Sequence, residues 1–337
     1  MNPASAQAAA APLLVCAPNW LGDGIMCMPA VQEYRAAHDT PLAVLVKPGL
    51  APLWRMQAAA DEILVYTPEA RETVRAAARL RRRVFRGAVV FPNSFRSAFL
   101  PWAGRVSPRR GRRGHWRGPL LTDVAAPGAA AAAGHQAGEY YELLGMPPAD
   151  PVPPPRLTPG PEAEEECRRR FGIEPGRRYA ALSPGAARGP SKRWPEEHFA
   201  AVGRALAGRG AAIVILGGRD EAALCERVAE AVGGSARSLA GRASLPAAAA
   251  VLAHCAVAVT NDSGGMHLAA AAGTRVVAVF GLTDPAKTGP LGPGHTVIAA
   301  PGARGARDIP RASAEAAACL RGIDPERVAS AAIEALV

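Results

Sequence analysis

Short apolar runs alternate along the chain with segments whose apolar positions recur at helical spacing. Such runs predict buried strands, because a strand in a parallel sheet is covered on both faces. The first half predicts strands at Leu13–Ala17, Leu42–Val46, Ile63–Tyr66 and Ala88–Phe91, and helices at Pro29–Ala37, Glu69–Arg83 and Gly138–Leu144. The second half predicts strands at Tyr179–Leu182, Ala212–Leu216, Val257–Thr260 and Val276–Phe280, and helices at Pro195–Ala207, Asp220–Ala231, Leu245–Ala253 and Met266–Ala272.

Strands that alternate with helices in this way form β-α-β units and parallel sheets. The two series are separated by a stiff, proline-rich linker that contains Pro151, Pro153, Pro154, Pro155, Pro159 and Pro161. We therefore expect an α/β protein with two Rossmann-like, doubly wound domains, at residues 1–152 and 161–320. A C-terminal helix at 321–337 follows, for which the N-terminal domain is a candidate packing partner. A length of 337 residues suits two domains.

The net charge of +10 comes from one part of the chain. The segment Arg79–Arg117 holds twelve Arg and neither Asp nor Glu, so subtracting its +12 leaves −2 for the rest. Such a cationic block suits nucleic acid or an anionic lipid surface. Nucleic acid is the weaker interpretation, because the spacing of the block's aromatic residues places most of them in the core, unavailable for stacking on bases. These residues are Phe85, Phe91, Phe95, Phe99, Trp102 and Trp116.

The six Cys residues include no C-x-x-C pair, which predicts reduced, buried thiols in a cytosolic protein. No uninterrupted apolar stretch reaches 18 residues, and Met1–Ala11 lacks the charged start of a signal peptide. We therefore expect a cytoplasmic protein that meets a membrane only at its surface.

Ligands of doubly wound sheets bind beyond the carboxyl ends of the strands, so the chemistry is expected there. The first strand is followed by Asn19, Trp20, Gly22 and Asp23. Asp23 is a candidate general base, the alternative being that it only caps the next helix. The strand Ala88–Phe91 is followed by Asn93, Ser94 and Arg96. These residues either cap a helix or bind an anionic, hydroxyl-rich ligand.

Three strand ends in the second half predict a nucleotide site. Ser183 and Gly185 precede Lys192, one of only three Lys in the chain and a candidate phosphate ligand. Gly217 and Gly218 allow a nucleotide to approach closely, and Asp220 suits ribose hydroxyls. The last of these strand ends leads into Asp262, Ser263, Gly264, Met266 and His267. A helix N-terminus there suits a pyrophosphate, Asp262 suits sugar hydroxyls, and His267 is either a phosphate donor or a core histidine.

Several common motifs are absent from the sequence. It contains no D-x-D carboxylate pair for a metal-bridged diphosphate, no P-loop and no G-x-S-x-G elbow. We therefore expect no metal and no cofactor.

Five motifs together carry a family resemblance, which extends from about Leu13 to Val328. They are Asn19–Asp23, Pro92–Ser97, Gly189–Pro195, Thr260–His267 and Gly281–Pro285. In this order and spacing they resemble the lipopolysaccharide heptosyltransferases of glycosyltransferase family 9, especially the heptosyltransferase II type. Gly265 departs from the pattern, because the family often has a larger apolar residue there.

The resemblance implies a GT-B fold, in which two Rossmann-like domains face each other across a cleft. It implies inverting transfer of heptose from ADP-L-glycero-β-D-manno-heptose to the inner core of lipopolysaccharide, without a D-x-D metal site. The family's base matches Asp23 and its phosphate-binding lysine matches Lys192. Its donor contacts match Asp220, Asp262 and His267, with Ser183, Gly185, Gly217, Gly218, Ser263, Gly264 and Met266 around them.

On the acceptor side, the resemblance implies contacts from Asn19, Trp20, Gly22, Asn93, Ser94 and Arg96. We add Arg112 and Arg113 from the cationic block, which is expected to hold the enzyme on anionic glycolipid at the cytoplasmic face of the inner membrane. The expected partners are thus a nucleotide-sugar donor, a lipopolysaccharide acceptor and an anionic membrane, without nucleic acid. The alternatives are a related enzyme that uses another nucleotide sugar, or a sugar-nucleotide epimerase, which would act without an acceptor.

Overall fold

The computed structural model describes residues 11–126, 128, 134–234, 236–301 and 310–336. The chain divides into two compact units, Met1–Pro153 and Pro154–Val337, and the division falls within the proline-rich segment. Of the N-terminal stretch Met1–Ala11, residues 1–10 lie outside the described part of the chain.

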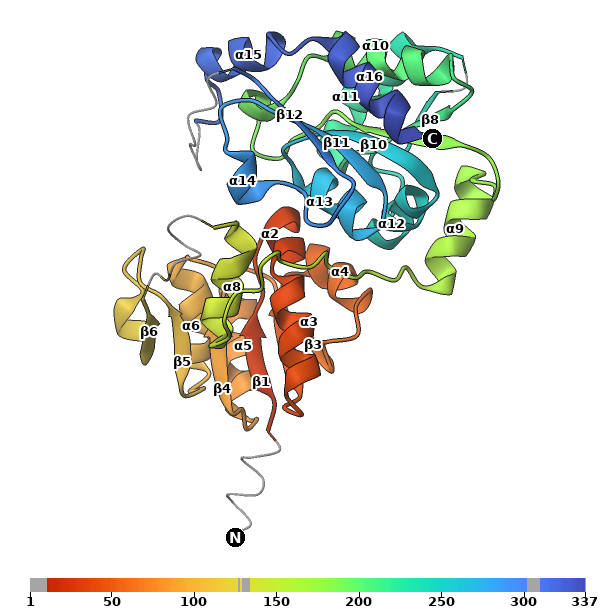
Figure 1. Ribbon diagram of the computed structural model, residues 1–337. Helices are drawn as coiled ribbons and strands as arrows, with labels where there is room; N and C mark the ends of the chain where they lie inside the picture. The colour runs from red at the N-terminus through yellow and green to blue at the C-terminus, as the bar shows by residue number, and fades with distance from the viewer. Residues whose placement is uncertain (1–10, 127, 129–133, 235, 302–309, 337) are drawn as a thin grey trace. The chain divides into compact units, whose positions relative to one another are not determined.

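The N-terminal unit is built on a six-stranded sheet in the order β3-β2-β1-β4-β5-β6 (Figure 1). All its neighbouring strands are parallel, which makes it a doubly wound sheet of the Rossmann order. Its strands are β1 (Leu13–Cys16), β2 (Leu42–Val46), β3 (Glu62–Val65), β4 (Gly87–Val90), β5 (Arg109–Arg112) and β6 (Asp123–Ala125). Its helices are α2 (Leu21–Met26), α3 (Met28–Ala37), η1 (Pro48–Leu50), α4 (Ala51–Arg55), α5 (Ala70–Arg81), α6 (Phe95–Ala103), η2 (Gly118–Leu120) and α8 (Gln136–Leu144).

The C-terminal unit repeats this topology with the strand order β12-β11-β10-β7-β8-β9, again parallel throughout. Its strands are β7 (Tyr179–Ser183), β8 (Ala212–Ile215), β9 (Arg237–Ser238), β10 (Cys255–Asn261), β11 (Arg275–Phe280) and β12 (Thr296–Ala299). Its helices are α9 (Pro161–Phe171), η3 (Pro190–Lys192), α10 (Glu196–Ala207), η4 (Arg219–Glu221), α11 (Ala222–Val232), α12 (Leu245–Ala253), α13 (Gly264–Ala271), α14 (Pro285–Thr288), α15 (Ala314–Arg321) and α16 (Pro325–Leu336). The expected α/β fold class is confirmed.

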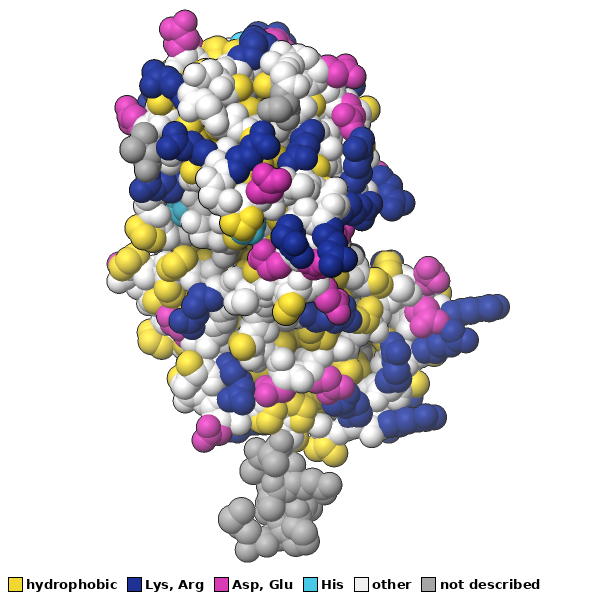
Figure 2. Space-filling view, turned by 90° about the vertical axis from the view of Figure 1, so that its right-hand side faces the viewer, with side chains coloured by type: hydrophobic (Ala, Val, Ile, Leu, Met, Phe, Trp, Pro, Cys, Tyr) yellow, Lys and Arg dark blue, Asp and Glu magenta, His cyan; other side chains and the backbone are white. Residues whose placement is uncertain are grey.

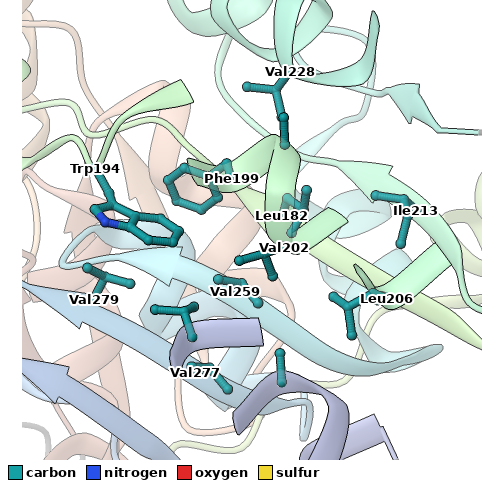
Figure 3. Close-up of a cluster of buried hydrophobic side chains, with 14 of the residues drawn as sticks. Leu182, Trp194, Phe199, Val202, Leu206, Ile213, Val228, Val259, Val277 and Val279 are labelled. Atoms are coloured by element: carbon teal, nitrogen blue, oxygen red, sulfur yellow. The ribbon is translucent and has the colours of Figure 1, made fainter. Parts of the chain in front are cut away.

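Each unit has its own apolar core, made largely of Ala, Val and Leu. In the N-terminal unit, Leu14 and Val90 on one sheet face pack with Leu80 of α5 and Leu100 of α6. The C-terminal core joins sheet residues such as Val259 to helices α10, α11 and α16 (Figure 3). Helices α5, α6, α10, α11 and α16 therefore cover their sheets with inward apolar faces, as the helical periodicity predicts.

The C-terminal helix α16 packs on α10 and on strands β10 and β11 of its own unit. Val328, Ala332 and Leu336 recur at helical spacing and are all buried in that core. The sequence had suggested the N-terminal domain as a packing partner, whereas this apolar face is used within the C-terminal unit.

All six Cys residues are free thiols, as the spacing predicts. Five of them are buried, and Cys319 on α15 is partly exposed. Burial raises the pKa of Cys16 and of Cys225 to about 12, and that of Cys167 to about 11. It also raises the pKa of Cys27 and Cys255 well above the usual thiol range.

Candidate active site

In the N-terminal unit, the two predicted site segments leave neighbouring strands. Strands β1 and β4 are paired with Cys16 opposite Val90, and the strand order reverses between them. The segments Asn19–Asp23 and Asn93–Arg96 therefore both begin at the carboxyl edge of the sheet, at the point where doubly wound sheets bind their ligands.

Asp23 lies in the first turn of α2 and is half-buried. The N-cap position belongs to Trp20, whose extended backbone precedes the helix, so Asp23 is not the helix cap that the alternative interpretation required. Its carboxylate Oδ1 accepts a hydrogen bond of 2.7 Å from Nε2 of Gln136, which also donates to the Tyr140 hydroxyl at 3.4 Å. Burial and the neighbouring Asp23 charge raise the pKa of Tyr140, which keeps this phenol neutral. Gln136 was not predicted as a site residue, since it follows Asp23 by more than a hundred positions.

The acceptor-side segment combines a helix cap with exposed polar groups. Ser94 caps α6 by accepting a hydrogen bond from the backbone N–H of Ser97 at 3.3 Å, as one interpretation predicted. Asn93 and Arg96 are exposed. Asn93 also lies against Gly114, where an added Cβ would come within 3.3 Å of its Oδ1. The loop after β5 is therefore a neighbour of the N-terminus of α6.

Much of the cationic block is engaged within the fold. Arg110 Nη1 pairs with Asp123 Oδ2 at 2.6 Å, and Arg112 Nη2 pairs with Glu142 Oε2 at 2.5 Å. Arg109 donates to the carbonyl oxygens of Leu120 and Val106, and Arg117 is completely buried. Burial lowers the pKa of the Arg117 guanidinium to about 10.

These contacts have consequences for the predicted acceptor residues. Arg112 is largely committed to ion pairs inside the unit, with a side chain that is 14% exposed, whereas Arg113 is exposed. The formal charge of the block therefore exceeds the charge that it presents to a ligand.

In the C-terminal unit, the reversal of strand order lies between β7 and β10, where Ser183 is opposite Thr260. Asn261 joins the loops at this edge. Its Oδ1 accepts a hydrogen bond from the Trp194 backbone N–H at 2.9 Å, and its Nδ2 donates to the carbonyl oxygens of Pro184 and Gly185 at 2.7 and 3.3 Å. The buried side-chain amide of Asn261 therefore holds both ends of the loop that contains Lys192.

Lys192 and Asp262 form a buried ion pair beside this amide. Nζ of Lys192 lies 2.5 Å from Oδ2 of Asp262, and the two side chains are 11% and 8% exposed. The same Oδ2 accepts a 2.8 Å hydrogen bond from the buried Thr283 hydroxyl, in the loop after β11. The sequence assigned Lys192 to a phosphate and Asp262 to sugar hydroxyls, and the structure brings the two residues into contact.

The loops after β7 and β8 meet around a carboxylate that the sequence did not single out. Oε2 of Glu221 accepts a 2.9 Å hydrogen bond from the Gly218 backbone N–H. A Cβ on Gly185 would come within 2.2 Å of this carboxyl group, so the glycine leaves room for it. Asp220, the predicted ribose ligand, is exposed on η4. The sequence could have indicated Glu221, because it directly follows Asp220 after the same glycine pair.

Helix α13 begins at this edge with Ser263 as its N-cap. Ser263 and Gly264 are half-buried, whereas Met266 and His267 are buried in the first turns. Gly265 lies against Ser183, and a Cβ at position 265 would be 3.3 Å from the Ser183 side chain. The close approach of the two loops thus explains why a small residue occupies this position.

Two general features concern metals and membranes. Among the described residues, no three His, Cys, Asp or Glu side chains are grouped as metal ligands would be. In the same part of the chain, no helix is both long and apolar enough to cross a membrane.

Comparison with known proteins places the chain among enzymes. The family model described as glycosyltransferase family 9 (heptosyltransferase) matches residues 73–314. Lipooligosaccharide heptosyltransferase 2 of Haemophilus influenzae is 30% identical over 303 residues, covering 85% of this chain and 88% of that protein. Lipopolysaccharide heptosyltransferase 2 of Escherichia coli K12 is also 30% identical, over 83% of this chain and 85% of its own length.

Among solved structures, E. coli ADP-heptose lipopolysaccharide heptosyltransferase II superposes with a TM-score of 0.83 at 28% identity. The match covers 96% of this chain and 98% of that one, and it confirms the predicted GT-B fold. The resemblance to the heptosyltransferase II type is confirmed by these relatives. The chain therefore belongs to glycosyltransferase family 9, the heptosyltransferases, and is a glycosyltransferase.

Proposed function

We propose that this enzyme transfers heptose from ADP-L-glycero-β-D-manno-heptose to the inner core of lipopolysaccharide, with inversion at the anomeric carbon. The observation that carries the proposal is the buried Lys192–Asp262 pair at the N-terminus of α13. A positive charge beside free helical N–H groups suits a diphosphate, and a neighbouring carboxylate suits sugar hydroxyls. The relatives are named for heptose transfer, and one of them for ADP-heptose.

The donor binds at the carboxyl edge of the C-terminal sheet. Lys192 and the first N–H groups of α13 hold the diphosphate and stabilise the negative charge that it gains as it leaves. Glu221, held by Gly218, takes the ribose hydroxyls in place of the predicted Asp220, because it is the carboxylate that lies between the glycine loops. Ser183, Gly185, Gly217, Ser263, Met266 and His267 line the same edge.

Asp23 acts as the general base. It removes the proton from an acceptor hydroxyl as that oxygen forms its bond to the anomeric carbon, and the bond from this carbon to the diphosphate oxygen breaks. Gln136 holds one carboxylate oxygen at 2.7 Å and thereby orients the base. Asn19, Trp20, Gly22, Asn93, Ser94, Arg96 and Arg113 surround the acceptor. Arg112 contributes through its ion pair with Glu142, by fixing β5 to α8.

The deciding experiment is a transfer assay with several nucleotide sugars and heptose-deficient lipopolysaccharide. We expect product only with both ADP-heptose and acceptor present. Turnover of donor without acceptor would indicate an epimerase, and a clear preference for another nucleotide sugar would reject the proposed donor.

Two variants test the assigned roles. Asp23→Asn should lower kcat by at least about 100-fold while ADP binding is retained, since general-base catalysis contributes about 10²–10⁴-fold. The matched control is Asp39→Asn, at an exposed position of the same unit. Lys192→Ala should weaken ADP binding in calorimetry as well as the rate, with Lys47→Ala as control. Near-normal turnover of the first variant, or unchanged ADP binding by the second, would contradict the proposed roles.

A further inference from the structure

Helix α6 has an outward face that is aromatic. Seven of its nine residues are apolar, and Phe95, Phe99 and Trp102 recur at helical spacing, with ring contacts from Phe95 to Phe99 and from Phe99 to Trp102. Phe95 is 48% exposed and Trp102 is 45% exposed. The prediction that the aromatic residues of the cationic block are mostly core is thus correct for Phe85 and Phe91 and wrong for Phe95, Trp102 and Trp116.

The inward face of α6 already satisfies its packing, because Ala98 and Leu100 are buried in the core of the N-terminal unit. A helix that is apolar on all sides is normally enclosed on all sides. Phe99 is partly buried against that core, whereas Phe95 and Trp102 on either side of it are exposed. Exposed aromatic rings in such a row mark a contact surface.

The charges around the row are positive. Arg96 and Arg105 are exposed at its two ends, and the chain has no Asp or Glu between Arg79 and Arg117. The neighbouring helix α5 covers the same sheet face and adds exposed Arg71 and Arg75 beside exposed Val74, with Glu72 paired to Arg75. On the face that Figure 2 shows, Lys and Arg side chains project among Asp and Glu side chains on both units.

We propose that the outer face of α6 docks the enzyme on an anionic lipid bilayer, with Phe95, Phe99 and Trp102 inserted at the headgroup level. Aromatic side chains favour this interface, and guanidinium groups bind lipid phosphates. Docking of a second copy of the chain through the same face is disfavoured, because the arginines of the two copies would repel each other. The row spans about 10 Å along the helix. It begins two residues after Asn93, so docking would place the acceptor-side segment at the lipid surface.

This proposal narrows the expected membrane contact of the cationic block to α6 and its neighbours, since Arg109, Arg110 and Arg112 are bonded within the fold. It rests on the proposed function, because docking on a membrane serves an enzyme whose acceptor is a lipid. Its test uses no substrate and is therefore independent of the transfer assay.

The experiment is sedimentation of the full chain with phosphatidylethanolamine–phosphatidylglycerol vesicles and with phosphatidylcholine vesicles. We expect binding to the anionic vesicles that weakens as salt is raised. The double variant Phe95→Ser/Trp102→Ser should lower the partition coefficient about tenfold or more, because each ring removes on the order of 100 Å² from water. The control Val297→Ser, at an exposed position on β12 of the other unit, should bind as wild type does.

A second measurement does not require the double variant Phe95→Ser/Trp102→Ser to fold. The test uses a Trp20→Phe/Trp116→Phe background, which removes the other two exposed tryptophans. Brominated lipids should quench the tryptophan fluorescence of this background, and adding Trp102→Phe should remove much of that quenching, because Trp54 and Trp194 are buried. No sedimentation with anionic vesicles, equal binding by the double variant, or quenching unchanged in Trp102→Phe would overturn the proposal. A change of oligomeric state in the double variant, without a change in vesicle binding, would instead identify a second copy as the occupant.

Transfer assays then separate docking from chemistry. In the double variant, transfer to an acceptor embedded in vesicles should fall, and transfer to a deacylated, water-soluble acceptor should persist. Equal loss on both acceptors would place these rings in the acceptor site and contradict a docking role. Absence of transfer by the wild type would reject the proposed function and leave the vesicle result standing.

Discussion

The buried ion pair of Lys192 and Asp262 allows the stability of the proposed donor site to be predicted. Both side chains are about nine-tenths buried, and Asp262 Oδ2 is the atom that accepts from both Lys192 and Thr283. Replacing Asp262 by Ala leaves an ammonium group in the interior without its counter-charge. Removing one partner of a buried pair costs about 3–5 kcal/mol. For a unit of this size, that lowers Tm by about 6–20 °C.

The assay is a double-mutant cycle followed by calorimetry and urea unfolding. Asp262→Ala and Lys192→Met should each destabilise the protein, and the double variant should be more stable than Asp262→Ala, because no charge is then buried alone. The same cycle at the exposed Arg227–Glu196 pair is the control, where we expect coupling below about 1 kcal/mol. Additive effects at Lys192 and Asp262, or a single variant within about 0.5 kcal/mol of wild type, would refute the reasoning.

Three further predictions concern other parts of the C-terminal unit. Glu221→Gln should weaken ADP binding in calorimetry about tenfold, because the variant loses a charge-assisted hydrogen bond to ribose. Asp220→Asn should change ADP binding little. A larger loss in Asp220→Asn than in Glu221→Gln would restore Asp220 as the ribose ligand. Burial lowers the pKa of His295, so the unfolded chain binds more protons as pH falls below about 6.5. Stability should therefore decline with falling pH in that range, and His295→Gln should flatten the slope in urea titrations at several pH values. Gly203→Ala should destabilise by about 1–3 kcal/mol despite the better helix propensity of Ala, because the new Cβ would come within 2.5 Å of Val232; a rise in Tm would show that the core yields.

The elements that the sequence predicts best are those whose formation depends on local pattern. Leu42–Val46 is found with the predicted bounds, because a strand covered on both faces consists of apolar residues throughout. Strand β5 was not predicted, since Arg109–Arg112 has no apolar pattern. It forms because β4 and β6 supply hydrogen bonds on both sides, and those partners are set by the tertiary fold.

The site shows the same limit. Strand ends and glycines locate the segments that carry Asp23, Lys192 and Asp262, because the doubly wound topology makes strand ends the binding edge. Which side chains then touch depends on loop geometry. The Lys192–Asp262 contact joins residues seventy positions apart, and the short helix η4 decides that Glu221 lies beside the glycines while Asp220 faces solvent.

The thiols of this chain make it selective toward labelling reagents. Maleimides react with the thiolate, and burial both hides five of the six sulfurs and disfavours their ionisation. Cys319 is therefore a natural single attachment point on the C-terminal unit, without removal of the other cysteines. A fluorophore there, paired with one on a cysteine introduced in the N-terminal unit, would report by energy transfer whether the two units move when a nucleotide binds.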